Sequence, residues 1–434
     1  MQQLYVGVGR AEIIPPMGTR MQGYTPAPVC TSVHDPVHVT VFVLSCGDTR
    51  VAVAAADMCN IGGDNSTIAR QALAKGADVP FENVILGCTH THSGPHAGHP
   101  EDAPFDFMQE VFCPNAEKAA AEAAANLRPA QMGIGTTHST VAVNRRQLKE
   151  NGKVVLGQDP AGTWDPTMTV IAFREPDGTP IGNLIHYGCH NTASGRTFGI
   201  SRDWSGVMID RLEAQSGGVT AYINGCGGDC GPRLPNGKTI GDVPMAMELG
   251  GQAGIDAVRA WNNIKMWQDV PVKVLSGQIV LPYDDIGTPE EAEAKAHAMG
   301  DPEELKQRKG PYISRYNKLL ERAEYIRQGN IPPTEQVIDH TVIALGPLVF
   351  QPIPFEPFSR ITLRIKEHSP FPYTVCVGYA NGSYGYFPSM DQIIRGGYEV
   401  EMFQNLKLVP YVNDAEQYYL DGSLALLRKL YEKE

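Results

Sequence analysis

The chain has 434 residues, of which 42% are hydrophobic and 19% charged, and it carries a formal net charge of -12 at pH 7. The net negative charge argues against a nucleic-acid-binding surface and against adhesion to anionic lipid. No stretch reaches the roughly 20 apolar residues that a membrane span needs, so we expect a large soluble globular protein without a membrane partner.

The N-terminus and the cysteines indicate a compartment. Met1-Gln2-Gln3-Leu4-Tyr5 has neither a basic segment nor an apolar segment of the kind that a secretory leader carries. The nine cysteines are odd in number and lie singly in apolar surroundings, which is typical of reduced thiols. We therefore predict a cytoplasmic protein.

Strands and helices alternate in the first part of the chain. Residues 37–44 and 51–56 are rich in β-branched side chains and predict two strands, and 84–86 predict a third. Residues 65–75 place apolar side chains on one helical face, and 115–127 form an alanine-rich helical pattern. This order predicts an α/β fold with mixed sheets, flanking helices and functional residues in loops at strand ends.

Histidines concentrate directly after the third predicted strand, in Cys88-Thr89-His90-Thr91-His92-Ser93-Gly94-Pro95-His96. In an extended His-x-His segment both rings lie on the same side, because side chains alternate with a period of two. Neutral imidazole is a common metal ligand and a proton-transfer group near neutral pH. The pattern predicts a metal or acid–base site, and the alternative is a histidine-rich surface loop.

A second histidine segment follows a predicted hairpin of residues 167–173 and 181–186, joined by Asp177-Gly178. Its second strand leads into His186 and His190. His186 is equally compatible with an ordinary position in the sheet. The loop that follows is a candidate wall of a substrate pocket.

Polar and glycine-rich segments at other strand ends supply further candidates. Asp57, which follows the strand 51–56, suits a helix cap, a partner of a metal-binding histidine or a substrate contact. Asp203 opens a predicted helix and suits a cap. The glycine-rich loop after 219–223 exposes backbone N–H groups that can bind an oxyanion, or it is a tight turn. Cys226 and Cys230 lack a second cysteine pair, which argues against a structural zinc site.

The second half of the chain contains a strand at 270–281, a hairpin of 337–345 and 348–353, and a closing amphipathic helix at 413–431. Between them, 287–328 is highly charged and predicts helices at 289–299, 302–309 and 312–327. Such a segment is typical of a solvated face, with a lid or a homo-oligomer contact as alternatives. We predict one domain over 1–434, in approximate halves of 1–265 and 266–434.

Several of these segments resemble the neutral, non-lysosomal ceramidase family. They are the segment from Gly7-Val8-Gly9 to Gly23-Tyr24, Asn144-Arg145, His90–Pro95, His186–His190, Pro354-Phe355-Glu356 and Tyr398-Glu399. The resemblance implies one zinc ion per chain, held by His90, His190, Glu356 and Tyr398. It also implies that His92 transfers a proton or stabilises an oxyanion, and that Arg145 binds the substrate carbonyl or a nearby polar group.

The chain departs from that family in two places. The family pattern G-D-x-S-P contains a functional serine, whereas this chain has Gly228-Asp229-Cys230-Gly231-Pro232, with Gly231 at the serine position. The family's smaller C-terminal β-domain is not expected here. The run of glycines around Gly231 suggests close approach of the backbone to a ligand. We take Asp57, His96, Asp203, Cys230 and Gly231 as candidate substrate-binding residues.

These features together predict a zinc-dependent hydrolase that cleaves a C–N amide-type bond of a small polar or acylated amino compound, rather than ceramide. In one alternative the protein also depends on a metal but is an ester or lactone hydrolase, or a sugar isomerase or lyase. Another alternative is a catalytically inactive ligand-binding protein.

Overall fold

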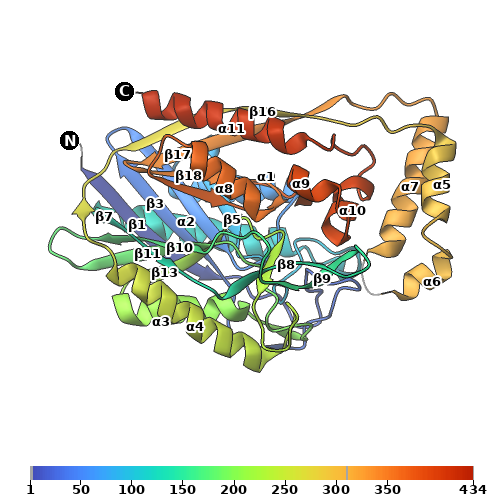
Figure 1. The fold of residues 1–434 in the computed structure, drawn as a ribbon. Helices are drawn as coiled ribbons and strands as arrows, with labels where there is room; N and C mark the ends of the chain where they lie inside the picture. Colours follow the sequence, from blue (N-terminus) through green and yellow to red (C-terminus); the bar gives the residue numbers. More distant parts are fainter. Residues whose placement is uncertain (1–2, 309–310, 434) are drawn as a thin grey trace.

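The structure, a computed structural model, describes residues 3–308 and 311–433. Three large mixed sheets lie at its centre, and helices cover their outer faces (Figure 1). The predicted fold class, α/β with mixed sheets and flanking helices, is therefore confirmed.

The first sheet has the strand order β5-β4-β3-β1-β6, antiparallel except for the parallel pair of β4 and β5. Helices α1 and α2 pack together and cover it. The bounds are β1 (Leu4–Glu12), β3 (His38–Cys46), β4 (Thr49–Ala56), β5 (Val84–Cys88), β6 (Arg128–Pro129), α1 (Gly63–Ala77) and α2 (Cys113–Ala125). Small residues allow α2 to lie close to β1, because a Cβ atom at Gly9 would stand 2.1 Å from the Ala119 carbonyl oxygen.

The second sheet has the order β13-β11-β10-β7-β15, and helices α3 and α4 cover it. The predicted hairpin is its antiparallel pair of β10 and β11, and β13 adds to β11 in parallel. The bounds are β7 (Gln131–His138), β10 (Thr167–Arg174), β11 (Pro180–Tyr187), β13 (Val219–Asn224), β15 (Trp267–Gln268), α3 (Asp203–Ser216) and α4 (Val243–Asn262).

The third sheet has the order β16-β17-β18-β20, with α8 and α11 packed on it. The bounds are β16 (Val272–Pro282), β17 (Glu335–Leu345), β18 (Leu348–Pro352), β20 (Tyr373–Val377), α8 (Ser359–His368) and α11 (Ala415–Glu432). Three small sheets complete the described strands: β12 (Gly199–Ile200) with β2 (Ser32–Val33), β14 (Cys230–Pro232) with β8 (Ala142–Leu148) and β9 (Val154–Asp159), and β19 (Glu356–Pro357) with β21 (Tyr386–Phe387).

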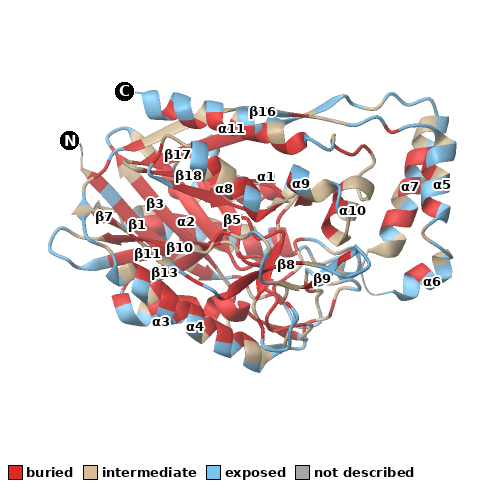
Figure 2. Ribbon diagram, in the orientation of Figure 1, coloured by how far each residue is buried: buried red, intermediate tan, exposed pale blue. Residues whose placement is uncertain are grey.

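One hydrophobic core lies where the three large sheets meet. It contains Phe42 of the first sheet, Leu184 of the second and Phe350 of the third, each at most 2% exposed. In β3 the alternate residues Val41 and Val43 face the helices α1 and α2 instead, as the period of two requires. Figure 2 shows this interior as a continuous buried zone beneath half-exposed helices.

The charged segment 287–328 forms helices α5 (Pro289–His297), α6 (Pro302–Gln307) and α7 (Tyr312–Arg327) at one end of the molecule (Figure 1). Lys309 of the predicted helix 302–309 lies outside the described residues. The segment is not solvated on all sides, because the Arg322 guanidinium is buried and donates hydrogen bonds to the Leu408 and Lys407 carbonyls at 2.9 and 2.8 Å. Arg315 pairs with Glu401 at 2.5 Å. The helices are thereby fastened to α10 (Tyr398–Asn405) and the loop after it.

Within 3–308 and 311–433, no helix combines the length and the apolar content that crossing a membrane requires.

Candidate metal and active site

The histidine segments lie where strands of all three large sheets end. Backbone hydrogen bonds join these ends directly: Cys88 N–H donates to the Tyr379 carbonyl at 3.2 Å, and Gly378 N–H donates to the Asn224 carbonyl at 3.0 Å. His92 N–H donates to the Asn191 carbonyl at 3.1 Å, so the two histidine segments also meet each other. The backbone of His90 has φ of +63°, a conformation that non-glycine residues seldom adopt and that clusters at functional sites.

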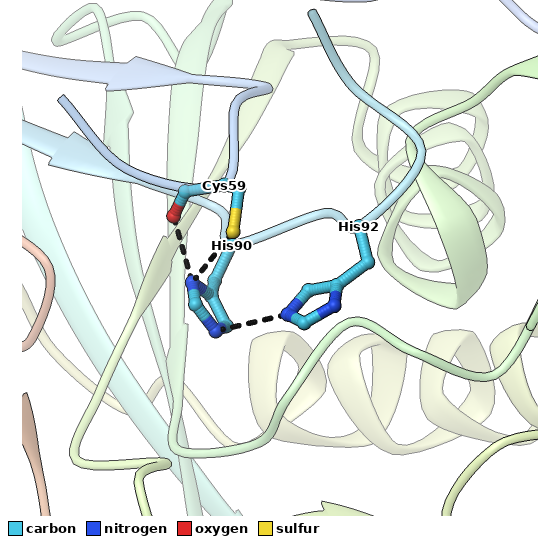
Figure 3. A group of neighbouring side chains, drawn as sticks. All are labelled: Cys59, His90 and His92. Carbon is cyan, nitrogen blue, oxygen red and sulfur yellow. Dashed lines mark hydrogen bonds between the residues drawn. The ribbon is translucent and has the colours of Figure 1, made fainter. Parts of the chain in front are cut away.

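Backbone carbonyls orient His90 and His190. His90 Nδ1 lies 2.7 Å from the Cys59 carbonyl oxygen, and His190 Nδ1 lies 2.6 Å from the Gly227 carbonyl oxygen (Figure 3 shows the first of these). A carbonyl only accepts, so each Nδ1 carries the proton and each Nε2 keeps its lone pair. Both Nε2 atoms lie 3.5 Å from the same Glu356 oxygen, Oε2.

This group of three ligand atoms has the chemistry of a cation site. Burial lowers the pKa of His90 and of His190 well below the usual value, so both rings are neutral at neutral pH, as metal ligation requires. His190 Nε2 and Glu356 Oε2 are buried and have no hydrogen-bond partner among the described residues. Ligand atoms of a tetrahedral zinc stand about 3.3 Å apart when the bonds are about 2.0–2.1 Å. The spacing, the neutral imidazoles and the unpartnered atoms fit a zinc ion.

His92 lies beside this group. Its Nε2 atom is 3.2 Å from His90 Nε2, and its Nδ1 atom has no partner among the described residues (Figure 3). Desolvation lowers the pKa of His92 to about 4. The Tyr24 ring packs edge-on against it at 5.0 Å, and a Cβ atom at Gly23 would stand 2.5 Å from the His92 ring. Gly23, at φ of +112°, therefore leaves the room that the His92 ring occupies.

Arg145 reaches the site through another residue. Its Nε donates to Glu399 Oε1 at 2.9 Å, and its Nη2 donates to the Tyr386 phenol oxygen at 2.8 Å. Tyr386 is the parallel-strand partner of Glu356 in the short pairing of β19 and β21, and its ring lies parallel to the His190 ring at 6.4 Å. Burial raises the pKa of Tyr386 above the ordinary phenol value.

A cavity of about 660 Å³ opens onto these residues. His90, His92 and Glu356 line it, together with the predicted residues His96 and Tyr398 and the unpredicted Tyr386. Its other walls come from the N-terminal segment, the loop after β4, the histidine loop, and the regions of α7 and α10. The residues are Arg20–Ala27, Val29, Cys59, Asn60, His99, Glu101, Pro311, Ser314, Met402 and Leu406. The charged segment 287–328 therefore contributes to the cavity through the start of α7.

Two predicted substrate-binding carboxylates are engaged elsewhere. Asp57 Oδ2 accepts from His38 N–H at 2.9 Å, and burial raises the pKa of Asp57 to about 6. Asp203 accepts from the backbone N–H groups of Ala193 and Ser194 at 3.0 and 2.8 Å. It is the first residue of α3, and Arg202 takes the cap position. Neither aspartate is among the described residues that line the cavity.

Cys230 and Gly231 lie behind His190. The Cys230 carbonyl accepts from His190 N–H at 3.0 Å, and the Cys230 thiol is fully buried. A Cβ atom at Gly231 would stand 2.6 Å from Thr239 Cβ. The close contact that Gly231 allows is therefore with Thr239. Neither Cys230 nor Gly231 is among the described residues that line the cavity.

Sequence patterns did not single out several residues of this cavity, among them Tyr386, Cys59, Gln22 and Asn60. Cys59 orients His90 through its carbonyl oxygen, which any residue type would supply. Tyr386 carried a weak signal, because it lies in the tyrosine- and glycine-rich stretch that follows Asn381.

The chain matches no protein-family model and no curated protein sequence. Among solved structures it is similar to a ceramidase complexed with C2, at 18% identity and a TM-score of 0.74, over 100% of this chain and 76% of that one. It is also similar to the neutral ceramidase from Pseudomonas aeruginosa, at 20% identity and a TM-score of 0.72, over 99% of this chain and 75% of that one. The resemblance to neutral ceramidases is confirmed for the fold, which is what similarity at this level of identity establishes.

Proposed function

We propose that the protein is a zinc-dependent hydrolase that cleaves a C–N amide-type bond of a small polar or acylated amino compound. The observation that carries the proposal is the convergence of His90 Nε2, His190 Nε2 and Glu356 Oε2. The last two of these atoms have no hydrogen-bond partner among the described residues. The fold shared with two ceramidases, which act on an amide, supports the choice of bond.

His90, His190 and Glu356 would hold the zinc ion, with a phenol as the fourth protein ligand. Tyr398 was predicted for that position, but the strand pairing with Glu356 and the proximity to His190 favour Tyr386. When bound, zinc supplies a Lewis acid that lowers the pKa of water and polarises a carbonyl oxygen.

The remaining residues bind, orient and move protons. His92 is neutral at neutral pH and its Nε2 atom lies 3.2 Å from His90 Nε2, so this nitrogen can take a proton from attacking water. It can return that proton to the amine nitrogen as the C–N bond breaks. Arg145 holds Tyr386 in place rather than contacting the substrate carbonyl. The cavity has room for a small amide, and its lining includes both charged and apolar residues.

Zinc content separates the ligands from the proton-transfer residue. We expect the purified protein to contain about one zinc per chain, and His90→Ala, His190→Ala and Glu356→Gln to lose it. His92→Ala should keep zinc and lose turnover of a panel of acylated amines. His138→Ala, at an exposed histidine, is the matched control. Absence of zinc from the wild-type protein would overturn the proposal.

The two tyrosines are distinguished by the same measurement. Tyr386→Phe should lower zinc retention during dialysis against a chelator by at least fivefold more than Tyr398→Phe. The reverse order would restore Tyr398 as the ligand. Zinc retention with turnover of esters or lactones, and none of amides, would favour the alternative chemistry.

A further inference from the structure

A second cavity, of about 450 Å³, lies between the charged segment 287–328 and the loop after α10. Its described lining has no residue in common with that of the candidate active site. The helix α7 contributes to both cavities, because Ser314 lines the first and Arg315 and Arg322 line the second. Figure 1 shows α7 between α5 and α10, the other two helices that border this region.

Two buried guanidinium groups line the second cavity, and one of them has no counter-ion. Arg315 and Arg322 are 9% and 3% exposed. Arg315 pairs with Glu401, but its Nε atom is enclosed and has no hydrogen-bond partner among the described residues. Arg322 donates only to backbone carbonyls, those of Leu408 and Lys407 among them, and forms no ion pair within 3–308 and 311–433. One buried positive charge therefore remains uncompensated.

A buried cation without a counter-ion is unusual, since buried charges in proteins are normally paired. Desolvation lowers the pKa of Arg322, which is the effect expected of a guanidinium that lacks an anionic partner. Its Nη1 atom makes no hydrogen bond to a described residue. Lys295 of α5 adds an exposed ammonium group to the same lining, and it too has no ion-pair partner in the described part of the chain. The wall formed by α5 and α7 is thus suited to an anion.

The rest of the lining limits the charge and the shape of such an anion. Asp284 and Asp285 also line the cavity, but both are exposed, and their Oδ1 atoms accept from the N–H groups of Asp285 and Gly287 at 2.9 Å. These carboxylates disfavour a second negative charge on the ligand. A guanidinium binds a carboxylate through two parallel hydrogen bonds, so a carboxylate fits better than a dianion.

Apolar side chains complete the second cavity. Ala298, Met299, Leu319 and Tyr411 line it beside the charged residues. A ligand that carries a short hydrocarbon chain would bury that chain against them.

We propose that this cavity is a second ligand site, which binds a small monocarboxylate with an apolar portion through Arg322, Arg315 and Lys295. The proposal does not depend on the zinc chemistry above. Such a ligand would contact α5, α7 and the loop after α10 together, so it would also hold the charged segment in place.

A matched pair of probes tests the site. Butyrate and 1-nitropropane have the same shape, but only butyrate is charged at pH 7, and ligand-observed NMR titration measures the affinity of the protein for each. We expect the wild-type protein to bind butyrate at least tenfold more tightly. Arg322→Gln should reduce this preference to below threefold, and Lys295→Met should reduce it at least threefold. Lys318→Met, at a lysine of α7 that pairs with Glu321 and is outside the described lining, should keep the full preference.

His90→Ala separates this site from the candidate metal site, where a carboxylate could also bind. This variant should keep the full preference for butyrate, and a loss of preference would place butyrate at the histidines and overturn the proposal. Equal or unmeasurable binding of the two probes by the wild-type protein would overturn it as well, as would full preference in both Arg322→Gln and Lys295→Met. Lys295 is exposed and forms no ion pair with the described residues, so its variant gives a result even if Arg322→Gln folds poorly.

Limited proteolysis tests the second part of the proposal. Butyrate should slow cleavage between 287 and 328 at least twofold in the wild-type protein, whereas 1-nitropropane at the same concentration should not. Unchanged cleavage at a saturating concentration of butyrate would contradict the holding role.

Discussion

Arg145 Nη2 donates a hydrogen bond of 2.8 Å to the phenol oxygen of Tyr386. The Nε side of the same guanidinium is held by Glu399, which Arg146 also contacts at 2.6 Å. Two adjacent arginines therefore share one buried carboxylate, whose residue is 1% exposed. Of these four residues it is Tyr386 that lines the cavity, so we expect Arg145 to act on the site by holding the tyrosine.

A double-mutant cycle tests this positioning role. Arg145→Lys keeps the charge but cannot reach Glu399 and Tyr386 together with the geometry of a guanidinium. We expect turnover of acylated amines to fall at least tenfold, and zinc to be retained. In a Tyr386→Phe background, Arg145→Lys should lower turnover less than twofold further, because its interaction with the phenol is already removed. Additive losses would mean that Arg145 contacts the substrate by itself.

Gly231→Ser is expected to destabilise the fold by about 1–3 kcal/mol, because the new Cβ atom would overlap the Thr239 side chain. Zinc should be retained, since His190 is held by the carbonyls of Gly227 and Cys230. Urea unfolding measures the loss. In a Thr239→Gly background the same serine should cost less than about 1 kcal/mol, whereas an undiminished cost would place the obstruction elsewhere.

Asp57 should make stability depend on pH. Burial raises its pKa in the folded state from 3.8 to about 6, so the folded protein binds this proton more tightly than the unfolded chain. The resulting stabilisation is complete below pH 3.8 and is lost as the pH rises through 6. Relative to Asp57→Asn, the wild-type free energy of unfolding should fall by about 2 kcal/mol from pH 4.5 to pH 7.5. A rising or flat difference would contradict the assignment.

Limited proteolysis tests how firmly the charged segment is attached. Arg322→Ala removes the buried guanidinium that binds the Leu408 and Lys407 carbonyls, so cleavage between 287 and 328 should accelerate at least fivefold. Lys318→Ala, which removes an exposed pair with Glu321, is the control and should change the rate less than twofold. Equal rates in all three proteins would mean that the segment is held by other contacts.

Elements with a regular local pattern were predictable. The strands β3, β4 and β5 and the helices α1 and α2 follow periodicities that are complete within each segment. The strand β1 was not predicted, because Gly7 and Gly9 interrupt the apolar pattern of the positions that face α2. Those glycines make room for α2, which is a requirement of packing and not of the local sequence.

The packing of the charged segment 287–328 could not be predicted from its local sequence either. Its composition is that of a solvated face, yet Arg322 is 3% exposed because backbone carbonyls of a distant loop satisfy its donors. At the site, the histidines were found from a local motif, and their meeting with Glu356 followed from family resemblance. Tyr386 lies at the site because its strand pairs with the strand of Glu356, and Cys59 contributes a backbone carbonyl oxygen. Neither contact can be predicted from the residues around it in the sequence.

The wide separation of His90, His190 and Glu356 along the chain constrains biosynthesis. During translation the first two imidazoles leave the ribosome long before the carboxylate that lies 3.5 Å from both of them in the finished protein. All three ligand atoms can face one another only after β19, which carries Glu356, has been made. Metal binding would therefore come late in folding. It would stabilise a fold that the three sheets have already formed, and it would not nucleate that fold.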